Sequence, residues 1–320
     1  MGRLVSVVVV TWNSAAHLSR CLDAVARQSH AARELIVVDN ASSDESVAVA
    51  EAHATQLVRN QTNRGFSAAV NQALAVAAGD YVQLVNPDCF LEPEYSARLV
   101  GALDEAGPEF GMATGKLLLA GDPHRIDSKG IRMTRAGRHF DIDQGEMDAG
   151  EGSALGTRGS EVFGVSGAAA MYRMSFLRDV AIDGEIFDED FFAYREDADL
   201  SWRGRLLGWR ALYVADAVAS HVRHVTPAKR RELSAAINMH SVKNRFLLRA
   251  KNEGLFLALR NAPFELARDI VTIAAVLTIE RTSLPALRWL WKNRAHILAK
   301  RRAIQKRRRV SDFRLARWFR

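Results

Sequence analysis

Cysteine and long apolar runs are both scarce in this chain of 320 residues. Its two cysteines, Cys21 and Cys89, are too few and too far apart for a disulfide framework or a four-cysteine zinc site, which fits a reducing compartment. The apolar run near the N-terminus is only about seven residues long and β-branched, so it predicts a first strand and no secretory leader. The apolar run from Ile270 to Ile279 is too short to span a bilayer and predicts a buried or interfacial helix.

The glycine-rich loops that bind nucleotides through backbone amides are also missing after the first strand. A dinucleotide-binding dehydrogenase needs G-x-G-x-x-G there, and a P-loop enzyme needs a glycine-rich loop with lysine, whereas residues 11–20 read TWNSAAHLSR. Both classes of enzyme are therefore excluded. A ligand at this strand end has to be held by side chains, with or without a metal.

Negative charge is scarce in the last third of the chain. From His221 to Arg320 there are 24 Lys and Arg against 6 Asp and Glu, while the first 220 residues carry 20 against 31, within a net charge of +7. An acidic body with a basic tail predicts a polyanionic partner, either nucleic acid or an anionic membrane surface. Nucleic acid is disfavoured, because no recognised nucleic-acid-binding module surrounds the basic run QKRRR.

Strands and helices alternate through the first hundred residues. LVSVVVVT (4–11), ELIVVD (34–39) and YVQLVNPD (81–88) predict strands, and SAAHLSRCLDAVARQ (14–28) and FSAAVNQALAVAAG (66–79) predict helices. Because the apolar strands are continuous runs linked by helices, they predict an α/β fold: a mostly parallel sheet with helices on both faces.

Short polar side chains follow three of these strands. The strand ends read Thr11-Trp12-Asn13, Asp39-Asn40 and Asn86-Pro87-Asp88. Because ligands of open parallel sheets bind outside the carboxyl ends of the strands, the three ends together predict a binding site. The alternative, that these residues only form turns and helix caps, is favoured for any one end taken alone and disfavoured for all three.

Five ordered motifs resemble those of the family 2 glycosyltransferases, which have the GT-A fold. They are VVVVTWNSAAHLSRCLDAV, ELIVVDNASSD, NRGFSAAVNQAL, YVQLVNPDCFLEP and FFAYREDADLSWRGRLLGW. The resemblance covers residues 4–221 and looks closest to the bacterial rhamnosyltransferase branch. It implies a GT-A catalytic domain over residues 1–225 and a basic helical extension over residues 226–320.

The resemblance implies a nucleotide site at the first two strand ends. Asp39 would accept a hydrogen bond from the imide N–H of uracil or thymine. The residues that would border the base are Thr11, Trp12 and Asn13. The residues that would form a wall around the nucleoside and diphosphate are Arg64, Gly65, Phe66 and Asn71. The alternative for this second set is a loop that enters an alanine-rich helix, and Ser67-Ala68-Ala69 departs from the glycines that are common in the family.

A metal site is implied at the third strand end, where the family carries a DxD-type motif. Asp88 is the expected ligand of Mg²⁺ or Mn²⁺, which neutralises the charge of the departing diphosphate. Asn86 stands in place of the first aspartate, so the site has one carboxylate fewer. His221 is the implied further ligand, although a lone histidine is as often structural.

The acidic stretch DEDFFAYREDADLSWR (188–203) is implied to carry the chemistry. Asp197 would be the base that takes the proton of the acceptor hydroxyl, and Glu196 its neighbour that shapes the acceptor site. The residues expected on the acceptor side are Gly167, Trp202 and Arg203. The alternative is that these acidic residues only occupy the first turn of a helix. Residues 116–160 predict a short hairpin and a variable loop around the acceptor.

The basic tail contains an amphipathic segment, ALRWLWKNRAHILAKRR (286–302). Leu287, Leu290, Trp291 and Leu298 are predicted to share one face of a helix whose remaining surface is basic. Tryptophan and positive charge together are typical of a helix that lies on an anionic membrane. The alternative is a helix that packs on the catalytic domain with a solvated basic face.

The sequence therefore predicts an inverting, metal-dependent glycosyltransferase. By resemblance, the donor is a dTDP- or UDP-sugar, with dTDP-L-rhamnose favoured. The expected acceptor is a lipid-linked or cell-surface saccharide, and the expected location is the cytoplasmic face of the cell membrane. A sugar nucleotidyltransferase is disfavoured by the missing basic glycine-rich loop, and a silent binding module by the joint presence of Asp88 and Asp197. Hydrolysis of the sugar nucleotide by water stays open.

Overall fold

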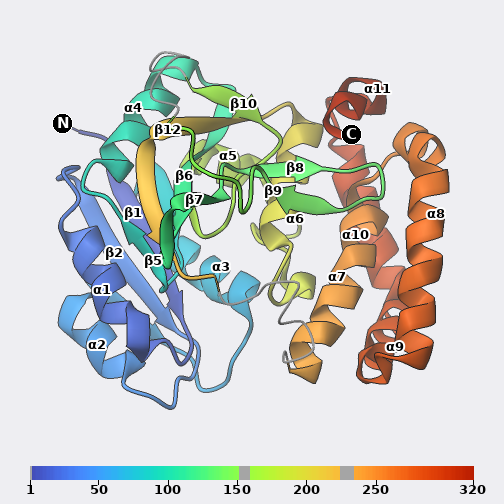
Figure 1. The fold of residues 1–320 in the computed structure, drawn as a ribbon, viewed down its shortest axis with the longest axis horizontal. Coiled ribbons are helices and arrows are strands. Elements are labelled where there is room, and N and C mark those ends of the chain that lie inside the picture. Colours follow the sequence, from blue (N-terminus) through green and yellow to red (C-terminus); the bar gives the residue numbers. More distant parts are fainter. Residues whose placement is uncertain (1, 151–158, 224–233) are drawn as a thin grey trace.

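The computed structural model describes residues 2–150, 159–223 and 234–320, and its core is one large mixed sheet (Figure 1). Within the described residues the strand order is β10-β12-β6-β11-β4-β1-β2-β3, with β5 beside β12 and β7 beside β6. The strands are β1 (Val5–Thr11), β2 (Arg33–Asp39), β3 (Gln56–Arg59), β4 (Tyr81–Val85), β5 (Cys89–Leu91), β6 (Phe110–Leu119), β7 (Asp122–Ser128), β10 (Ser160–Val162), β11 (Ala169–Arg173) and β12 (Arg210–His221). A separate hairpin consists of β8 (Ile131–Met133) and β9 (His139–Asp141).

The N-terminal half of the sheet is parallel, as its apolar strands predict. β4, β1, β2 and β3 run in the same direction, and β6 and β12 also pair in parallel. β11 lies between β4 and β6 and is antiparallel to both. This antiparallel strand brings the residues just before it to the carboxyl end of β4, where the predicted site lies.

Helices cover both faces of the sheet because alternate side chains of the strands point to opposite sides. Val7 of β1 packs with α1 and α4 in one apolar cluster, and Val8 packs with α3, α5 and α6 in another. The helices of this part are α1 (Ala15–Ala26), α2 (Ser46–His53), α3 (Phe66–Val76), α4 (Tyr95–Ala106), α5 (Met174–Val180) and α6 (Glu196–Leu207), with a 3₁₀ turn η1 (Glu189–Phe191). The predicted fold class, a mostly parallel sheet with helices on both faces and a helical C-terminal part, is confirmed.

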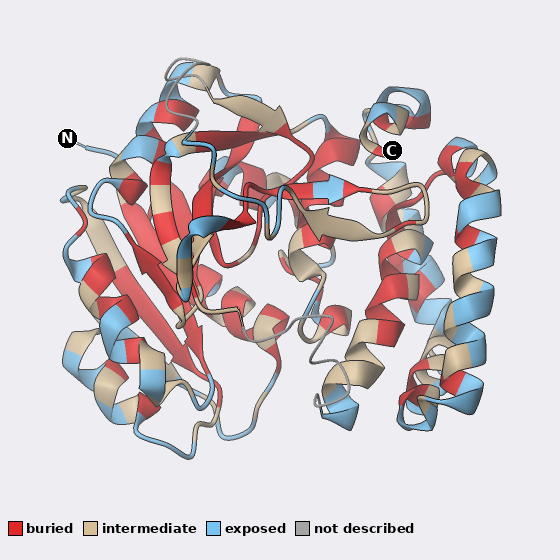
Figure 2. Cartoon of the chain, in the orientation of Figure 1, coloured by how far each residue is buried: buried red, intermediate tan, exposed pale blue. Residues whose placement is uncertain are grey.

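The C-terminal helices pack against α6 and η1 through a third apolar cluster. Trp202 of α6 and Phe191 of η1 share this cluster with Leu247, Ile304 and Phe319. The elements of this part are α7 (Ala235–Asn252), α8 (Leu255–Thr278), η3 (Arg281–Ser283), α9 (Leu284–Lys292), α10 (Arg294–Lys306), α11 (Asp312–Leu315) and η4 (Ala316–Trp318). In Figure 2 much of α8 is coloured as exposed, at the edge of the molecule farthest from α1 and α2.

Two sequence-based expectations for the tail have different outcomes. The predicted domain boundary at residues 225 and 226 lies outside the described residues and stays a prediction. The predicted continuous helix over residues 286–302 is wrong, because the chain turns at Asn293, where α9 ends and α10 begins. Leu287 and Leu290 consequently pack inward, while Trp291 and Leu298 are exposed.

Candidate active site

The carboxyl ends of β1, β2 and β4 lie side by side, which brings together the three polar strand ends. β1 pairs in parallel with both β2 and β4, and Thr11 at the end of β1 lies opposite Asp39 at the end of β2. Asn86 follows β4 directly. The three ends therefore open on the same side of the sheet, where open parallel sheets bind their ligands.

Asp39 is a buried carboxylate with one unpartnered oxygen. It is 2% exposed, and its Oδ2 accepts a hydrogen bond from the backbone N–H of Ser42 at 3.1 Å. Among the residues that the structure describes, Asp39 Oδ1 has no hydrogen-bond partner, and neither has the buried Oγ1 of Thr11. Because a buried acceptor without a partner is costly, these oxygens point to a ligand that donates a hydrogen bond.

The two residues after Thr11 differ in what they contact. Trp12 is 55% exposed, which leaves its ring available to a ligand above the strand ends. Asn13 has a positive φ of 51°, and its Oδ1 accepts a hydrogen bond from the backbone N–H of Ser43 at 2.7 Å. Asn13 therefore ties the loop after β1 to the loop after β2.

Arg64 and Gly65 lie directly before α3, and we call them the wall segment. They are held in place by Asn40, the residue after Asp39. Asn40 Nδ2 donates to the carbonyl oxygen of Gly65 at 3.1 Å, and Asn40 Oδ1 accepts from the backbone N–H of Arg64 at 3.0 Å. Gly65 has φ +85°, and a Cβ there would lie 2.6 Å from the ring of Phe192. Only glycine fits this place, because the segment lies directly against the loop that precedes α6. Phe66, half-buried, is the first residue of α3.

Asp88 and His221 converge at the end of β4, where the sequence implies a metal. Asp88 Oδ1 lies 3.4 Å from His221 Nε2, and His221 Nδ1 lies 2.8 Å from Oδ2 of Asp127. Asp127 is fully buried in β7 and also accepts a hydrogen bond from Arg223. Burial alone would lower the pKa of His221, but the hydrogen bonds with Asp127 and Asp88 raise it to about 9.

This arrangement fits a hard divalent cation. Asp127 holds one ring nitrogen of His221 so that the other faces Asp88, which is how a carboxylate commonly orients a metal-binding histidine. Asp88 would supply a carboxylate oxygen and His221 a ring nitrogen. Among the described residues no group of three or more His, Cys, Asp or Glu side chains is placed to hold a metal ion, so a cation here needs further ligands besides Asp88 and His221.

We expect Asp127→Asn to weaken metal dependence without abolishing it. The substitution removes the charge that orients His221, and loss of such an outer partner typically costs about 10- to 100-fold in metal affinity. The measurement is the Mn²⁺ concentration that gives half-maximal nucleotide binding. Asp122→Asn is the matched control, since Asp122 lies on the same strand and pairs only at the surface, with Arg125 at 3.1 Å. An unchanged Mn²⁺ requirement in Asp127→Asn would contradict the assignment of His221 as a metal ligand.

Glu196 and Asp197 begin α6 and form a pair of carboxyl groups with raised pKa. Asp197 Oδ2 accepts a hydrogen bond from the backbone N–H of Gly167 at 3.1 Å, and Oδ1 accepts from that of Ala198 at 2.7 Å. Burial is the main cause that raises the pKa of Asp197, with a contribution from Asp141. Burial and the adjacent Asp197 raise the pKa of Glu196 to about 8. A carboxylate of this kind is suited to accept a proton near neutral pH.

Hydrogen bonds connect these parts into one site. The backbone N–H of Asn86 donates to the carbonyl of Ala168 at 2.9 Å, next to the Gly167 that binds Asp197. On the other side, the N–H of Ser67 donates to the carbonyl of Phe192 at 3.2 Å. The loop over residues 188–195 therefore lies between the wall segment and the two carboxyl groups of α6.

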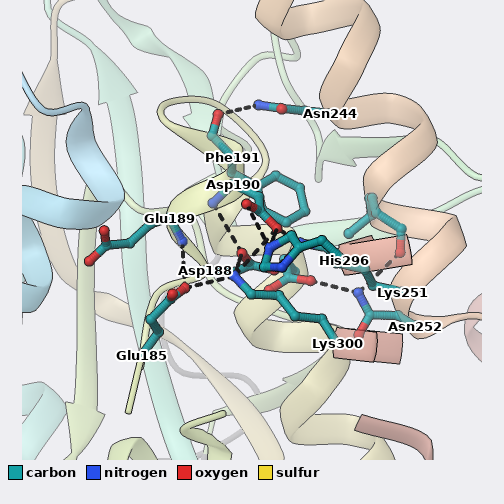
Figure 3. Close-up of polar contacts among 12 residues, drawn as sticks. Glu185, Asp188, Glu189, Asp190, Phe191, Asn244, Lys251, Asn252, His296 and Lys300 are labelled. Atoms are coloured by element: carbon teal, nitrogen blue, oxygen red, sulfur yellow. Dashed lines mark hydrogen bonds and ion pairs between the residues drawn. The ribbon is translucent and has the colours of Figure 1, made fainter. Parts of the chain in front are cut away.

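This loop has an unusual backbone, and α7 holds it through Asn244 (Figure 3). Phe192, Tyr194 and Arg195 all have positive φ, a conformation that costs about 1–3 kcal/mol per non-glycine residue. Asn244 Nδ2 lies 2.8, 2.8 and 2.7 Å from the carbonyl oxygens of Phe191, Ala193 and Tyr194, respectively. One buried amide group of the C-terminal helices thus stabilises the strained loop in front of Asp197.

Two lysines of the C-terminal helices fix the start of the same loop. Lys251 Nζ of α7 lies 2.5 Å from Asp188 Oδ2 and 2.6 Å from Asp190 Oδ2, and Lys300 Nζ of α10 lies 2.7 Å from Asp188 Oδ1. Burial alone would raise the pKa of Asp188, but the two lysines hold it well below its usual range. The acidic stretch is therefore divided: Asp188 and Asp190 are structural anchors, whereas Glu196 and Asp197 form no ion pair with a lysine or arginine of the described residues.

We expect Asn244→Asp to lower kcat by about 100-fold, because a carboxylate facing three carbonyls displaces the loop and small displacements of reacting groups have effects of this size. The measurement is kcat together with the melting temperature. Arg249→Gln is the matched control on α7, since Arg249 contacts Glu265 and Asp269 of α8 at 3.0 and 2.5 Å, away from the loop. Arg249→Gln should lose stability and keep kcat; a wild-type kcat in Asn244→Asp would refute the positioning role.

Three of the residues predicted for the site have other contacts. Trp202 is fully buried and packs on Phe319 with ring centroids 4.9 Å apart, so the prediction that it faces an acceptor is wrong in this structure. Arg203 is also buried, and it donates to Asp199 and to two backbone carbonyls. Asn71 exchanges two hydrogen bonds with the backbone of Phe187, which fastens α3 to the segment before η1. All three residues stabilise the elements that carry the site.

Sequence reasoning missed several residues that position the site. Asp127 lies in the stretch over residues 116–160 that the sequence left without a role, although the hairpin predicted there is present as β8 and β9. Asn244 and Lys251 lie on a helix remote in sequence from the loop that they hold. Asn40 alone carried a signal, because it stands directly after Asp39 at a strand end.

Comparisons with known proteins identify the family to which the chain belongs. The family model "Glycosyl transferase family 2" matches residues 6–181, more than half of the chain. EpsE of Bacillus subtilis, which its name places among the glycosyltransferases, is 26% identical over 216 residues, 62% of this chain and 75% of EpsE. The chain belongs to glycosyl transferase family 2, and the predicted enzyme class, a glycosyltransferase, is confirmed.

Two solved structures share the fold. TarS 1–349 of S. aureus, in complex with UDP-GlcNAc, has a TM-score of 0.55 at 16% identity and covers 98% of this chain and 92% of its own. The mannosyltransferase PcManGT of Pyrobaculum calidifontis, in complex with GDP-Man and Mn²⁺, has a TM-score of 0.54 at 19% identity and covers 95% and 85%. At these identities the likeness concerns the fold alone.

Proposed function

We propose that this protein is an inverting, metal-dependent glycosyltransferase that moves a sugar from a dTDP- or UDP-sugar to a hydroxyl of a saccharide. The observation that carries the proposal is a pair of buried oxygens at the strand ends, Asp39 Oδ1 and Thr11 Oγ1, which have no hydrogen-bond partner among the described residues. The imide N–H of uracil or thymine is a donor of the kind that Asp39 lacks. Trp12, exposed beside it, offers a ring face to the base.

The other residues of the site have two roles in this proposal: some hold the cation that neutralises the diphosphate, and one accepts a proton. When bound, Mg²⁺ or Mn²⁺ supplies neutralisation of the diphosphate, and Asp88 and His221 would hold it. The Mn²⁺ complex of PcManGT supports the choice of a divalent cation. Asp197 accepts the proton of the acceptor hydroxyl at its carboxylate as that oxygen attacks the anomeric carbon from the face opposite the leaving diphosphate. The N–H of Gly167 holds this carboxylate in place.

The donor sugar, the acceptor and the location extend the proposal. The resemblance of the motifs to the rhamnosyltransferase branch favours dTDP-L-rhamnose, and the UDP-GlcNAc complex of TarS supports a pyrimidine diphosphate sugar. The acceptor would be a lipid-linked or cell-surface saccharide at the cytoplasmic face of the cell membrane, where the basic tail is attracted to anionic lipid. Hydrolysis is the competing reaction, in which water takes the place of the acceptor.

Calorimetric titration with dTDP, UDP and GDP, each with and without Mn²⁺, tests the nucleotide site. We expect Mn²⁺-dependent binding of dTDP or UDP, and about 10- to 100-fold weaker binding in Asp39→Ala, because a buried donor of the base loses its acceptor. Asp44→Ala is the control, since Asp44 lies in the same loop, is exposed, and accepts a hydrogen bond from Ala15 at 3.0 Å. Binding of GDP alone, or of no nucleotide, would contradict the proposal.

A further inference from the structure

On helix α8 the charged side chains face the protein and most of the large apolar side chains face solvent, which is the reverse of the usual surface helix. Its charged side chains face the protein: Glu265 and Asp269 pair with Arg249 of α7, and Arg260 donates to the carbonyls of Ala316 and Phe319. Its large exposed side chains are apolar instead. The large exposed ones are Leu255, Phe256, Leu259, Phe264, Leu266, Ile270, Val271, Ile273 and Leu277. We call these nine residues the α8 outer face.

The α8 outer face is continuous and is extended at both ends. Spacings of three, four and seven residues place Phe256, Leu259, Leu266, Ile270 and Leu277 in one stripe along the helix. Beyond the start of the helix, the exposed Phe313 of α11 lies with its ring 6.0 Å from that of Phe256, and beyond its end Ile279 is 82% exposed. Contiguous exposed apolar surface on this scale marks an interaction site.

The exposed charged side chains of residues 234–320 are all basic. Throughout residues 234–320 every acidic side chain is buried or half-buried, and these are Glu253, Glu265, Asp269, Glu280 and Asp312. Exposed basic side chains occur on the elements that adjoin or follow α8, and they include Arg281 of η3, Arg288 and Lys292 of α9 and Arg314 of α11. The exposed Trp291 lies among them on α9.

We propose that the α8 outer face docks on a membrane that contains anionic lipid, with the helix lying in the plane of the interface. Apolar side chains would enter the boundary between headgroups and acyl chains, and the adjoining arginines and lysines would meet the anionic headgroups. This inference deepens the proposed membrane location and rests on the proposed function only for its biological setting.

Charge distinguishes this occupant from a second copy of the chain. Two copies joined through the α8 outer face would bring their exposed basic residues together with no exposed acidic partner from residues 234–320, which disfavours the contact. Anionic lipid is complementary to the same residues. The docking helix also differs from the segment 286–302 that the sequence suggests, because α8 carries most of the exposed apolar surface.

Docking differs from crossing the membrane. Among the described residues no single helix is long and apolar enough to cross a bilayer. The pair formed by Leu255–Thr278 and Arg281–Lys292 meets the criterion of length and composition together, but the two parts are bent by 106°. A docked α8 would release from vesicles in alkaline carbonate, whereas resistance to extraction would overturn a surface position.

Co-sedimentation of the full chain with vesicles tests the proposal. We expect binding to phosphatidylcholine vesicles that contain anionic phosphatidylglycerol, much weaker binding to phosphatidylcholine alone, and about a 100-fold loss in the Leu259→Glu, Ile270→Glu, Leu277→Glu triple variant. Because these side chains already face solvent, the variant should keep its melting temperature. The matched control is Val76→Glu with Met147→Glu, two exposed apolar residues outside the tail, which should bind vesicles like the wild type.

The outcomes separate docking from its alternatives. Equal binding of wild type and triple variant, or no binding by the wild type, would overturn the proposal. A wild-type dimer that the triple variant dissociates, with vesicle binding unchanged, would assign the face to a second copy. Nucleotide titration without vesicles is independent of α8, so failure of vesicle binding with intact nucleotide binding would refute docking alone, and the reverse would refute the proposed function alone.

Discussion

Asp197→Asn is expected to lower the rate of sugar transfer by about 10²- to 10⁴-fold, the range that removal of a general base produces. The amide has nearly the same shape as the carboxylate and can still accept a hydrogen bond from the N–H of Gly167, so the loop and α6 should keep their positions. Nucleotide binding should remain within about threefold of the wild type, because among the described residues Asp39 and the wall segment make no hydrogen bond with Asp197. The measurements are single-turnover transfer and calorimetric titration.

The pH dependence of transfer provides the control for this assignment. A base acts in its ionised form, so the rate should rise with pH as the carboxyl loses its proton. Because burial raises the pKa of Asp197, this rise should lie above the range of an ordinary aspartate. Glu196→Gln should reduce transfer less than Asp197→Asn. Near-wild-type transfer by Asp197→Asn, or a flat profile through the acidic range, would assign the base elsewhere.

Asp88→Ala is expected to abolish Mn²⁺-dependent binding of the donor and to lower transfer by about 10³-fold, since charge neutralisation by a cation is worth several kcal/mol at the leaving group. Asp88 lies 3.4 Å from His221 and is the carboxylate closest in sequence to the end of β4. Metal-free binding of the nucleoside alone should persist, because the base would be held at Asp39. The measurement is the Kd for the nucleoside diphosphate with and without Mn²⁺.

The Asp88 variant also tests whether the chain uses a cation at all. Retention of the full Mn²⁺ effect in Asp88→Ala would move the metal site away from β4. Absence of any Mn²⁺ effect in the wild type would assign the neutralisation of the diphosphate to the protein, and His221, whose pKa of about 9 keeps it charged in the absence of a cation, would be the nearest positive group.

The C-terminal helices carry the residues that hold the loop and, separately, the face that we propose to dock on a membrane. Asn244, Lys251 and Lys300 hold the loop over residues 188–195 from the side opposite the nucleotide wall. Helix α8 lies on the other side of α7 and α10 (Figure 1), and among the described residues the exposed side chains of the α8 outer face take no part in the hydrogen bonds that hold the loop. A variant of α8 and a variant of Asn244 should therefore affect different measurements.

Much of the site could be predicted from the sequence because local rules govern it. Continuous apolar strands linked by helices require a parallel sheet, and a parallel sheet brings Thr11 and Asp39 together at its carboxyl edge. Asp39, Asp88 and Asp197 each stand in a motif whose chemistry depends on neighbours in sequence. Trp202 was misplaced because a helix motif alone does not show which side of α6 faces the interior.

The residues that position the site could not be predicted, because their partners are distant in sequence. Asp127 meets His221 from a strand 94 positions earlier, and Asn244 meets Phe191 from a helix 53 positions later. No feature of the sequence around Asn244 indicates that its side chain lies against three backbone carbonyls. Such contacts depend on how whole elements pack, and packing is a property of the complete fold.

The sequence by itself determined the family, the α/β sheet and the polar strand ends, because residue type and short spacing are sufficient for each. Only the tertiary structure decided which carboxylates serve as anchors and which stay available, since that depends on whether Lys251 and Lys300 reach them. It likewise decided which side of α8 meets solvent. The charged residues of that helix find partners inside the protein, and its apolar residues are therefore left outside.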